Sequence, residues 1–365
     1  MPTDDENYII EQFTLIDNDF ESLANLLTDA FLHDEAAEKD GGTIIFDAET
    51  FRRFFGSPYM PKDLFVRAIF KPTNEVVGFI GCIPRPVKIG EKIIKFVVPS
   101  FAAVHSKHQR KGLSIKMGLE LRRFLVEKGY EAGFAMFEPE QKGKDLGHSV
   151  IRHSDDIFPM QRIMTIRKFI IRIFDVKKVA TVIRLKWYEK AGIKLFEKIQ
   201  KVNNPNIRKF KPSDAEQLYE LLEDHLKNNQ MSVMRDHDDF IWYLQQPGVN
   251  CVVHENSDGQ VDGFIVAWKF NFAGYGNIIP FGWLDSVHTY RLSVKDATDL
   301  CKYLVLTAHE LGWYGFQSPY IPYFDPKPFK KSKFLFFPKI LTIDVFRRSD
   351  IKFPKKINSF YFDWR

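Results

Sequence analysis

The sequence has few cysteines and no long apolar stretch, and both absences narrow the class of protein. Its three cysteines lie far apart without C-x-x-C spacing, which excludes a disulfide-rich secreted domain and a zinc module and indicates reduced thiols. No uncharged apolar run reaches the roughly 18 residues that a membrane helix needs. The first six residues, MPTDDE, are acidic and no apolar core follows them, so we expect no secretory signal. These features predict a cytoplasmic protein without a membrane span.

The length and composition indicate a globular chain of more than one domain. The chain has 365 residues, of which 45% are apolar and 15% aromatic, including 35 Phe. This length is too great for one small domain and suits two compact domains of ordinary size. The phenylalanines are sufficient for large cores and for an apolar pocket.

Charge is distributed unevenly along the chain. Residues 1–50 contain fourteen acidic side chains and one lysine, whereas residues 161–190 contain nine Lys/Arg and residues 327–356 contain ten. The basic stretches can form a solvated face, or a surface that attracts an anionic cofactor or partner. The aromatics do not alternate with Arg and Gly as stacking platforms would, so the pattern does not favour nucleic acid.

Four short patterns occur twice in the same order, which indicates internal duplication. A helix start of pattern D-x-E-x-L-x-x-L-L begins at Asp19 and again at Asp214, and a G-F-I segment after a polar turn begins at Gly78 and again at Gly263. The other two matches are Val104-His105 with Val287-His288, and Gly129-Tyr130 with Gly312-Trp313. Each copy predicts the order strand, helices, hairpin, long strand, helix, strand.

The repeat predicts an α+β protein with two tandem domains, each a mixed, mostly antiparallel sheet flanked by helices. We place the first domain at 1–165, a basic connecting segment at 166–204 and the second domain at 205–365. The alternative is a pair of unrelated α+β domains that share common helix starts.

The most informative segment runs from Val97 to Ser114. It begins as a strand of β-branched and small residues, passes through a basic turn and opens an amphipathic helix. The free N–H groups of a first helical turn, together with the helix dipole, favour an anion such as phosphate. Gly112 would let the ligand approach the backbone, and Gln109, Arg110 and Lys111 would add donors and positive charge. An ordinary strand, turn and helix is the alternative interpretation.

The segment Gln109-x-x-Gly112-x-Ser114 resembles the Q/R-x-x-G-x-G/A pyrophosphate loop of the GNAT acyltransferases, with Ser at the final small position. The duplication resembles the tandem GNAT folds, and within that group the chain looks most like the N-myristoyltransferases. Three further segments carry this likeness: Phe101-Ala-Ala-Val-His105, Met160-Gln-Arg162 and Asp239-Phe-Ile-Trp-Tyr-Leu244.

The resemblance implies roles for the residues that match the pattern. The backbone of Ala102, Ala103 and Val104 would pair with the pantetheine amides like an added strand. The N–H groups of Phe101 and Ala102 would form an oxyanion hole for the thioester oxygen. The coenzyme A pyrophosphate would lie on Gln109, Arg110, Lys111, Gly112, Leu113 and Ser114. Pro99 beside this point indicates a bulge or an edge, since proline cannot donate to a ladder.

The corresponding turn of the second copy, residues 288–294, has no glycine and a single Arg. We therefore expect the first domain to bind the cofactor and the second, degenerate domain to shape the acceptor site. The aromatic, proline-rich loop 319–326 could wall that acceptor groove, or it could be a packed surface loop.

Acyl transfer to an amine needs a base for the amine proton and an acid for the leaving thiolate. Histidine suits the first role, and His148 and His153 are candidates because the resemblance places their segment near the thiol end of the cofactor. His105 and His108 flank the loop and suit phosphate contact or a surface position. The resemblance also implies a C-terminal carboxylate as base, but the tail that would carry it is missing here, which leaves the carboxylate of Arg365 as a third candidate.

We expect an acyl-CoA-dependent N-acyltransferase, most simply an N-acetyltransferase, that transfers an acetyl or longer group directly to an amine in a ternary complex. The acceptor could be a peptide, a lysine or a small amine. The co-substrate would be acetyl-CoA or a longer acyl-CoA, with no metal and no covalent intermediate. The alternative is a binding protein, an acyl-CoA sensor or scaffold that has kept the loop and lost the chemistry.

Overall fold

The computed structural model describes residues 4–33, 42–138, 160–354 and 357–365. The chain forms two compact units. Unit 1 contains Met1–Ala36, Ile45–Thr165 and Ile340–Ile357, and unit 2 contains Ala37–Ile44, Ile166–Lys339 and Asn358–Arg365. Each unit therefore includes a segment from the opposite part of the sequence, and residues 166–204 lie in unit 2.

Unit 1 is built on a mixed sheet with strand order β1-β3-β4-β7-β8-β16. Neighbouring strands of this sheet run antiparallel, except β7 and β8, which run parallel. The strands are β1 (Tyr8–Phe13), β3 (Phe65–Phe70), β4 (Glu75–Pro84), β7 (Phe96–Val104), β8 (Ala132–Phe137) and the second half of β16 (Leu335–Arg347). A small hairpin is formed by β5 (Val87–Ile89) and β6 (Lys92–Ile94). The α-helices described in this unit are α1 (Asp19–Leu32), α3 (Ala48–Phe55) and α4 (Leu113–Glu127).

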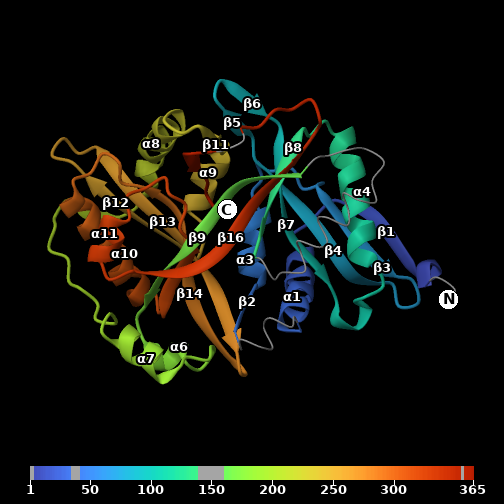
Figure 1. Ribbon diagram of the computed structural model, residues 1–365, viewed down its shortest axis with the longest axis horizontal. Coiled ribbons are helices and arrows are strands. Elements are labelled where there is room, and N and C mark those ends of the chain that lie inside the picture. Colours follow the sequence, from blue (N-terminus) through green and yellow to red (C-terminus); the bar gives the residue numbers. More distant parts are fainter. Residues whose placement is uncertain (1–3, 34–41, 139–159, 355–356) are drawn as a thin grey trace. The chain divides into compact units, whose positions relative to one another are not determined.

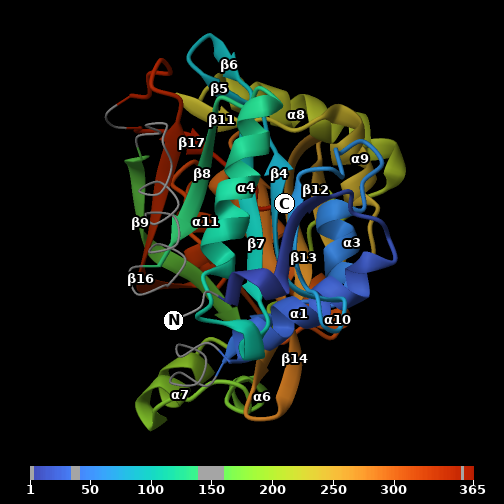
Figure 2. The ribbon, with the colours of Figure 1, turned by 90° about the vertical axis from the view of Figure 1, so that its right-hand side faces the viewer.

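The core of unit 1 lies where α4 covers the sheet (Figure 2). Leu113, Met117, Leu121 and Phe124 recur at helical spacing and are buried, because this spacing puts them on one face of the helix. They pack with buried strand residues that include Val66, Ala68, Val77, Ile80 and Val97. The contact fixes α4, and with it the turn from which the helix starts.

Unit 2 repeats this plan with strand order β9-β15-β14-β13-β12-β10, and β2 also pairs with β13 (Figure 1). The strands are β2 (Thr43–Ile45), β9 (Met160–Ile173), β10 (Ile207–Lys209), β12 (Val249–Glu255), β13 (Val261–Gly274), β14 (Asn277–His288) and β15 (Gly315–Pro319). A short parallel pair joins β11 (Met231–Val233) to β17 (Phe360–Tyr361). The α-helices are α6 (Val176–Val179), α7 (Trp187–Lys194), α8 (Ala215–Lys227), α9 (His237–Leu244), α10 (Val294–Glu310) and α11 (Lys327–Lys331).

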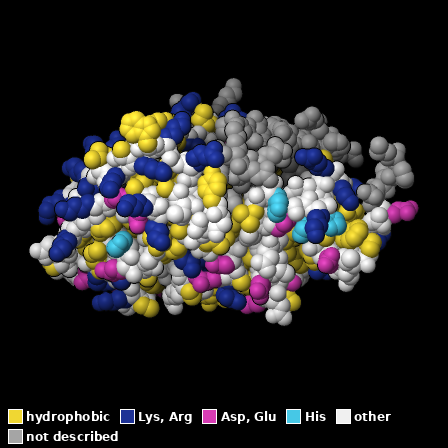
Figure 3. Space-filling view, turned by 90° about the horizontal axis from the view of Figure 1, so that it is seen from below, with side chains coloured by type: hydrophobic (Ala, Val, Ile, Leu, Met, Phe, Trp, Pro, Cys, Tyr) yellow, Lys and Arg dark blue, Asp and Glu magenta, His cyan; other side chains and the backbone are white. Residues whose placement is uncertain are grey.

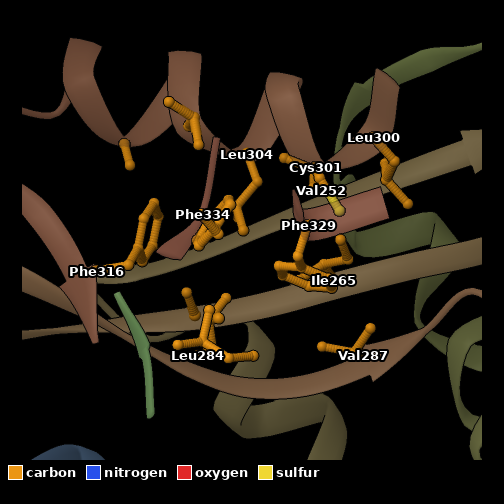
Figure 4. Packing of buried hydrophobic residues seen from close by; sticks show 14 of the residues in the cluster. Val252, Ile265, Leu284, Val287, Leu300, Cys301, Leu304, Phe316, Phe329 and Phe334 are labelled. Carbon is orange, nitrogen blue, oxygen red and sulfur yellow. The ribbon is translucent and has the colours of Figure 1, made fainter. Parts of the chain in front are cut away.

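The core of unit 2 is formed between α10 and the strands beneath it (Figure 4). Leu300 and Leu304 of α10 face Val252, Ile265 and Leu284 of the sheet, and all five are almost fully buried. Phe316, Phe329 and Phe334 complete the cluster. Part of the abundant phenylalanine is therefore core material.

The two units share one succession of elements, so the predicted tandem α+β fold is confirmed. The series β1, α1, α3, β3, β4, β7, α4, β8 in unit 1 matches β10, α8, α9, β12, β13, β14, α10, β15 in unit 2. In each unit the last two strands are parallel and pair at two positions only, at Phe96–Val97 in unit 1 and at Gly282–Trp283 in unit 2. Among the described residues, no helix combines the length and hydropathy needed to span a bilayer.

Candidate functional site

The site begins where β7 and β8 part. The two strands pair at Phe96↔Ala132 and Val97↔Gly133 and, within the described residues, at no later position, while β8 continues along β16 as far as Phe137. Pro99 stands on β7 just beyond the last pair, and it has no N–H for a ladder. The rest of β7, from Val98 to Val104, therefore presents one backbone edge that no β8 residue covers, as an added strand would require.

A β-bulge interrupts β7 at Phe101. The ladder with β4 pairs Ile80 with Ala102 and Gly81 with Ser100, which leaves Phe101 as the extra residue. Its φ is +59°, an unusual value for a bulky side chain and a form of stored strain that is common at functional sites. The expected bulge thus exists, but it lies two residues beyond Pro99. It takes the Phe101 peptide out of the regular ladder, beside Ala102, at the point where the oxyanion hole is expected.

The strained backbone is held by aromatic packing. The Phe101 ring lies 4.8–5.8 Å, between centroids, from the rings of Phe46, Phe51, Phe54 and Phe55. Three of these phenylalanines come from the short helix α3, and such ring pairs add about 0.5–1.5 kcal/mol each beyond simple burial. This phenylalanine cluster can offset the 1–3 kcal/mol expected for the strained residue.

The basic turn ends at an uncapped helix start. Gly112 is the N-cap of α4, with φ +75° and no side-chain cap, and a Cβ built on it would meet nothing within 4 Å. The first bond of the helix runs from the Lys116 N–H to the Gly112 carbonyl, so the N–H groups of residues 113–115 have no helical acceptor. Gly112 is therefore needed for its backbone conformation, and the space above it is open for an anion to approach.

The turn is fixed to unit 1 by polar contacts of its first residues. Asp29 of α1 accepts the Ser106 N–H at 2.7 Å and the Ser106 hydroxyl at 3.2 Å. His108 Nδ1 bonds to the Tyr8 hydroxyl at 2.9 Å, and the Lys111 ammonium lies 5.6 Å from the Tyr8 ring centroid. The Gln109 side-chain amide donates to the Val104 carbonyl. These contacts join the end of β7 to the start of α4.

The turn has a positive local field. Burial, followed by the nearby Lys111, lowers the pKa of His108 from its ordinary value, so its imidazole is neutral at pH 7. Arg110 and Lys111 are exposed. Uncapped N–H groups beside exposed cations are suited to a diphosphate.

The equivalent turn of unit 2 is already occupied by its own side chains. Ser293 caps α10 by accepting the Asp296 N–H, and its hydroxyl donates to the Asp296 carboxylate at 2.6 Å. Arg291 is paired with Asp224 of α8. A capped start with a carboxylate in its first turn disfavours an anion, and the degenerate role of this domain stays a prediction.

Unit 2 also contains a buried cluster of charges around a second bulge. In the β13–β14 ladder, Val266 pairs with Ser286 and Ala267 with Leu284, so Asp285 is the bulged residue. Its Oδ1 accepts the N–H groups of Trp364 and Arg365 at 2.6 and 3.1 Å. Four further buried charged residues belong to this cluster: Arg235, Asp239, Asp363 and Arg365.

The structure describes Arg365 and His105 but not the other two candidate histidines. The Arg365 guanidinium donates to Asp239 at 2.5 Å and lies over the rings of Trp242 and Tyr243. This side chain therefore belongs to the charge cluster of unit 2, and the role of the Arg365 carboxylate as base stays a prediction. His148 and His153 lie outside the described residues. His105 accepts the Lys107 N–H and lies 3.6 Å from Asp29, which makes it a turn residue.

Other expectations concern thiols, metals and the aromatic loop. All three cysteines are buried, and burial raises the pKa of the Cys82 thiol. Within the described ranges, no group of three or more His, Cys, Asp and Glu residues could hold a metal ion. In the loop 319–326, Tyr323 accepts the Val287 N–H and packs against the unit 2 core. This contact supports the packed-loop interpretation.

Sequence reasoning missed three features of the two strand–turn–helix segments. The contact of Asp29 with Ser106 could not be foreseen, because an acidic residue on an exposed helix turn is common. The positive φ of Phe101 gave none, because phenylalanine rarely adopts it. The bulge at Asp285 could have been suspected, since an isolated Asp inside the apolar β14 pattern is costly to bury without partners.

Comparison with known proteins finds relatives of this chain among acyltransferases. No family profile matches the sequence. Over 300 residues the chain is 23% identical to the glycylpeptide N-tetradecanoyltransferase of Plasmodium falciparum, covering 78% of this chain and 68% of the relative. The Drosophila melanogaster enzyme of the same name is 24% identical over 258 residues, covering 68% of this chain and 50% of the relative.

The structural comparison covers more of the chain. Saccharomyces cerevisiae N-myristoyltransferase with bound myristoyl-CoA matches with a TM-score of 0.72 at 18% identity, covering 93% of this chain and 79% of that one. A GCN5-related N-acetyltransferase from Kribbella flavida matches with a TM-score of 0.50 at 11% identity, covering 93% and 72%. The chain therefore has a tandem GNAT-like acyltransferase fold with the organisation of the N-myristoyltransferases.

Proposed function

We propose that this protein is an acyl-CoA-dependent N-acyltransferase in which unit 1 binds the co-substrate. The observation that carries the proposal is the continuous path from the bulge at Phe101, along the edge of β7 that β8 does not cover, to the start of α4, which has no side-chain cap. A thioester, a pantetheine arm and a diphosphate would meet an oxyanion hole, a strand edge and a helix N-terminus in that order.

The reaction follows from this order. The acceptor amine attacks the thioester carbonyl, the new C–N bond forms and the C–S bond breaks. The N–H groups of Phe101 and Ala102 would stabilise the oxyanion of the intermediate. The amine loses its proton to a base, and the coenzyme A thiolate takes up a proton as it leaves. Both substrates are bound together, so no acyl-enzyme is formed.

We infer that the acyl group is long and that the acceptor is a peptide. The curated relatives transfer a tetradecanoyl group to glycyl peptides, according to their names, and give no support to an acetyl group. The phenylalanine cluster around Phe101 places apolar rings beside the proposed thioester position, which suits an alkyl chain better than a polar acyl group.

The experiment is a thiol-release assay with tetradecanoyl-CoA and acetyl-CoA, using a peptide with N-terminal glycine and the same peptide N-acetylated as control. We expect turnover only with tetradecanoyl-CoA and the free amine. Turnover with acetyl-CoA alone would reject the long-chain assignment. Binding of both thioesters without turnover across a set of amines and peptides would favour the acyl-CoA sensor, and no binding at all would reject both functions.

A further inference from the structure

The segment around α7 exposes apolar side chains that the core does not use. Trp187 is 81% exposed and Leu195 is 76% exposed, more than any other large hydrophobic residue described in the chain. Tyr188 is 51% exposed, and no residue of α7 is buried. A helix that buries nothing gains little stability from packing, so its apolar residues need another reason to be there.

The exposed residues form one face. Trp187, Ala191 and Leu195 recur every four residues and therefore lie above one another, with Tyr188 beside them. Lys190 and Lys194, one helical turn apart, lie along the border of this face. The arrangement is that of an interfacial amphipathic helix, which places aromatic and aliphatic side chains on one side and lysines at the edge.

Both ends of the segment are anchored in unit 2, so α7 is held outward at a fixed place. Before it, Val176 and Val179 of α6 are buried. After it, Ile199 packs against the unit 2 core, and the Arg172 guanidinium donates to the carbonyls of Glu197 and Lys198. The helix is thus presented by the fold and is not a loose tail.

The charge of the segment is positive and outward. Residues 175–201 contain eight Lys/Arg and three acidic residues. The three carboxylates are used internally: Asp175 caps α6, Glu189 accepts the Lys186 N–H and Glu197 accepts the Val176 N–H. Lysines of the segment are exposed, at positions 177, 178, 186, 190, 194, 198 and 201. Figure 3 shows Lys and Arg side chains interspersed with hydrophobic ones over its left half, on the side of α6 and α7.

A cavity of about 440 Å³ lies beside this surface. Its lining includes the cationic side chains Lys177 and Lys194, the carboxylates of Asp175 and Glu197, and His309. Lys194 belongs both to the cavity and to α7.

We propose that α7 and its flanking lysines form a docking surface for a membrane with anionic phospholipids. Trp187 and Leu195 enter the headgroup and acyl boundary, and the lysines contact lipid phosphates. Charge complementarity and the two most exposed apolar side chains favour this partner over a protein. The proposal does not rest on the acyltransferase function, since no residue of the unit 1 site takes part.

The test is co-sedimentation of the full chain with vesicles of phosphatidylcholine alone and with 30% phosphatidylserine. We expect binding only to the phosphatidylserine vesicles, weakened by salt, with a blue shift of tryptophan fluorescence that Trp187→Phe removes. Trp187→Ser with Leu195→Ser should reduce binding tenfold or more, as should Lys190→Glu with Lys194→Glu. These substitutions should leave the far-UV circular dichroism and melting temperature unchanged, because α7 buries no side chain.

Two variants serve as matched controls. Ile278→Ser changes a side chain that is 61% exposed at the β13–β14 hairpin of the same unit, and Lys330→Glu with Lys331→Glu changes α11. Neither should alter vesicle binding. Equal loss in the controls, unchanged binding of the α7 variants, or no binding to anionic vesicles would overturn the proposal. So would a dimer in light scattering that only the Trp187 and Leu195 variant dissociates, since the occupant would then be a second copy.

Discussion

The starts of α4 and α10 occupy equivalent places in the two units and differ in what they offer to solvent. The α4 start has a glycine in the left-handed region, no side-chain cap and exposed Arg110 and Lys111. The α10 start has the Ser293 cap, the Asp296 carboxylate and an arginine already paired with Asp224. The two units repeat one succession of elements, and under the proposed function a few turn residues decide which unit can receive an anion.

The two bulges extend this comparison along the preceding strand. Phe101 is surrounded by phenylalanine rings, whereas Asp285 is surrounded by buried charges. In unit 1 the bulge peptides lie on an edge that β8 does not cover. In unit 2 the bulge carboxylate binds the last two backbone N–H groups of the chain. Under the proposed function the first bulge faces the thioester, whereas the second fixes the backbone of residues 364–365.

The largest effect should come from Gly112→Val. A β-branched residue at φ +75° is strongly disfavoured, and its side chain would occupy the open space above the helix start. We expect affinity for coenzyme A to fall at least a hundredfold in calorimetric titration. Gly259→Val is the matched control, because Gly259 has φ +76° and equally open surroundings in a hairpin turn of unit 2. If both variants bind like the parent, the α4 start does not hold the cofactor.

The next effect separates the two basic turns. Arg110→Ala with Lys111→Ala should weaken coenzyme A binding about tenfold to a hundredfold and reduce its salt dependence, since hydrogen bonds to charged groups are lost. Arg291→Ala should leave affinity unchanged, because that side chain is engaged with Asp224. A larger loss from Arg291→Ala would reverse the assignment of the two units.

The two bulges should differ in how their contribution to the free energy of unfolding depends on pH. Burial and the neighbouring Asp363 carboxylate raise the pKa of Asp285 to about 6, from an ordinary 3.8, against the opposing effect of Arg235. A raised pKa means that the folded state holds the proton more tightly. Protonation of Asp285 therefore stabilises the folded state below about pH 4, and this contribution to the free energy of unfolding is lost as pH rises towards 6.

The measurement is urea unfolding of the parent and Asp285→Asn between pH 4 and 6. The parent's free energy of unfolding, relative to the variant, should decrease by about 2 kcal/mol over this range. Phe101→Leu, the control at the first bulge, should show a constant difference from the parent. A constant difference for Asp285→Asn would mean that the carboxylate stays ionised beside Arg235.

The smallest effect tests the caps. Ser293→Ala removes the hydroxyl that accepts the Asp296 N–H and should cost about 1 kcal/mol of unfolding free energy. Ser114→Ala, near the start of α4, should change stability by less than half of that, because α4 has no side-chain cap. Equal losses would show that Ser114 contributes to the α4 start in a way that the contacts do not reveal.

The repeated architecture could be predicted from the sequence because the repeated residues act within a single helix or turn. The leucines after Asp19 and Asp214 define a buried helix face in both units, and Gly112 lies at the start of α4 with open space above it. One proposed match was displaced by two positions. Ile80 pairs with Ala102 whereas the equivalent Ile265 pairs with Val287, so Val287 corresponds to Ala102, and His105 and His288 are not equivalent.

Other features depend on long-range contacts that local patterns do not encode. The second half of β16 pairs with β8, some 200 residues earlier, and any amphipathic strand would give the same sequence pattern. The charge cluster around Asp285 joins residues from α9, β14 and the chain end, each unremarkable alone.

Hydrogen–deuterium exchange with and without coenzyme A tests the central comparison most directly. We expect slower exchange of the backbone N–H groups of residues 101–104 and 112–115 when coenzyme A is added, with no change in residues 285–297. Protection at the start of α10, or no protection at the start of α4 under saturating ligand, would contradict it.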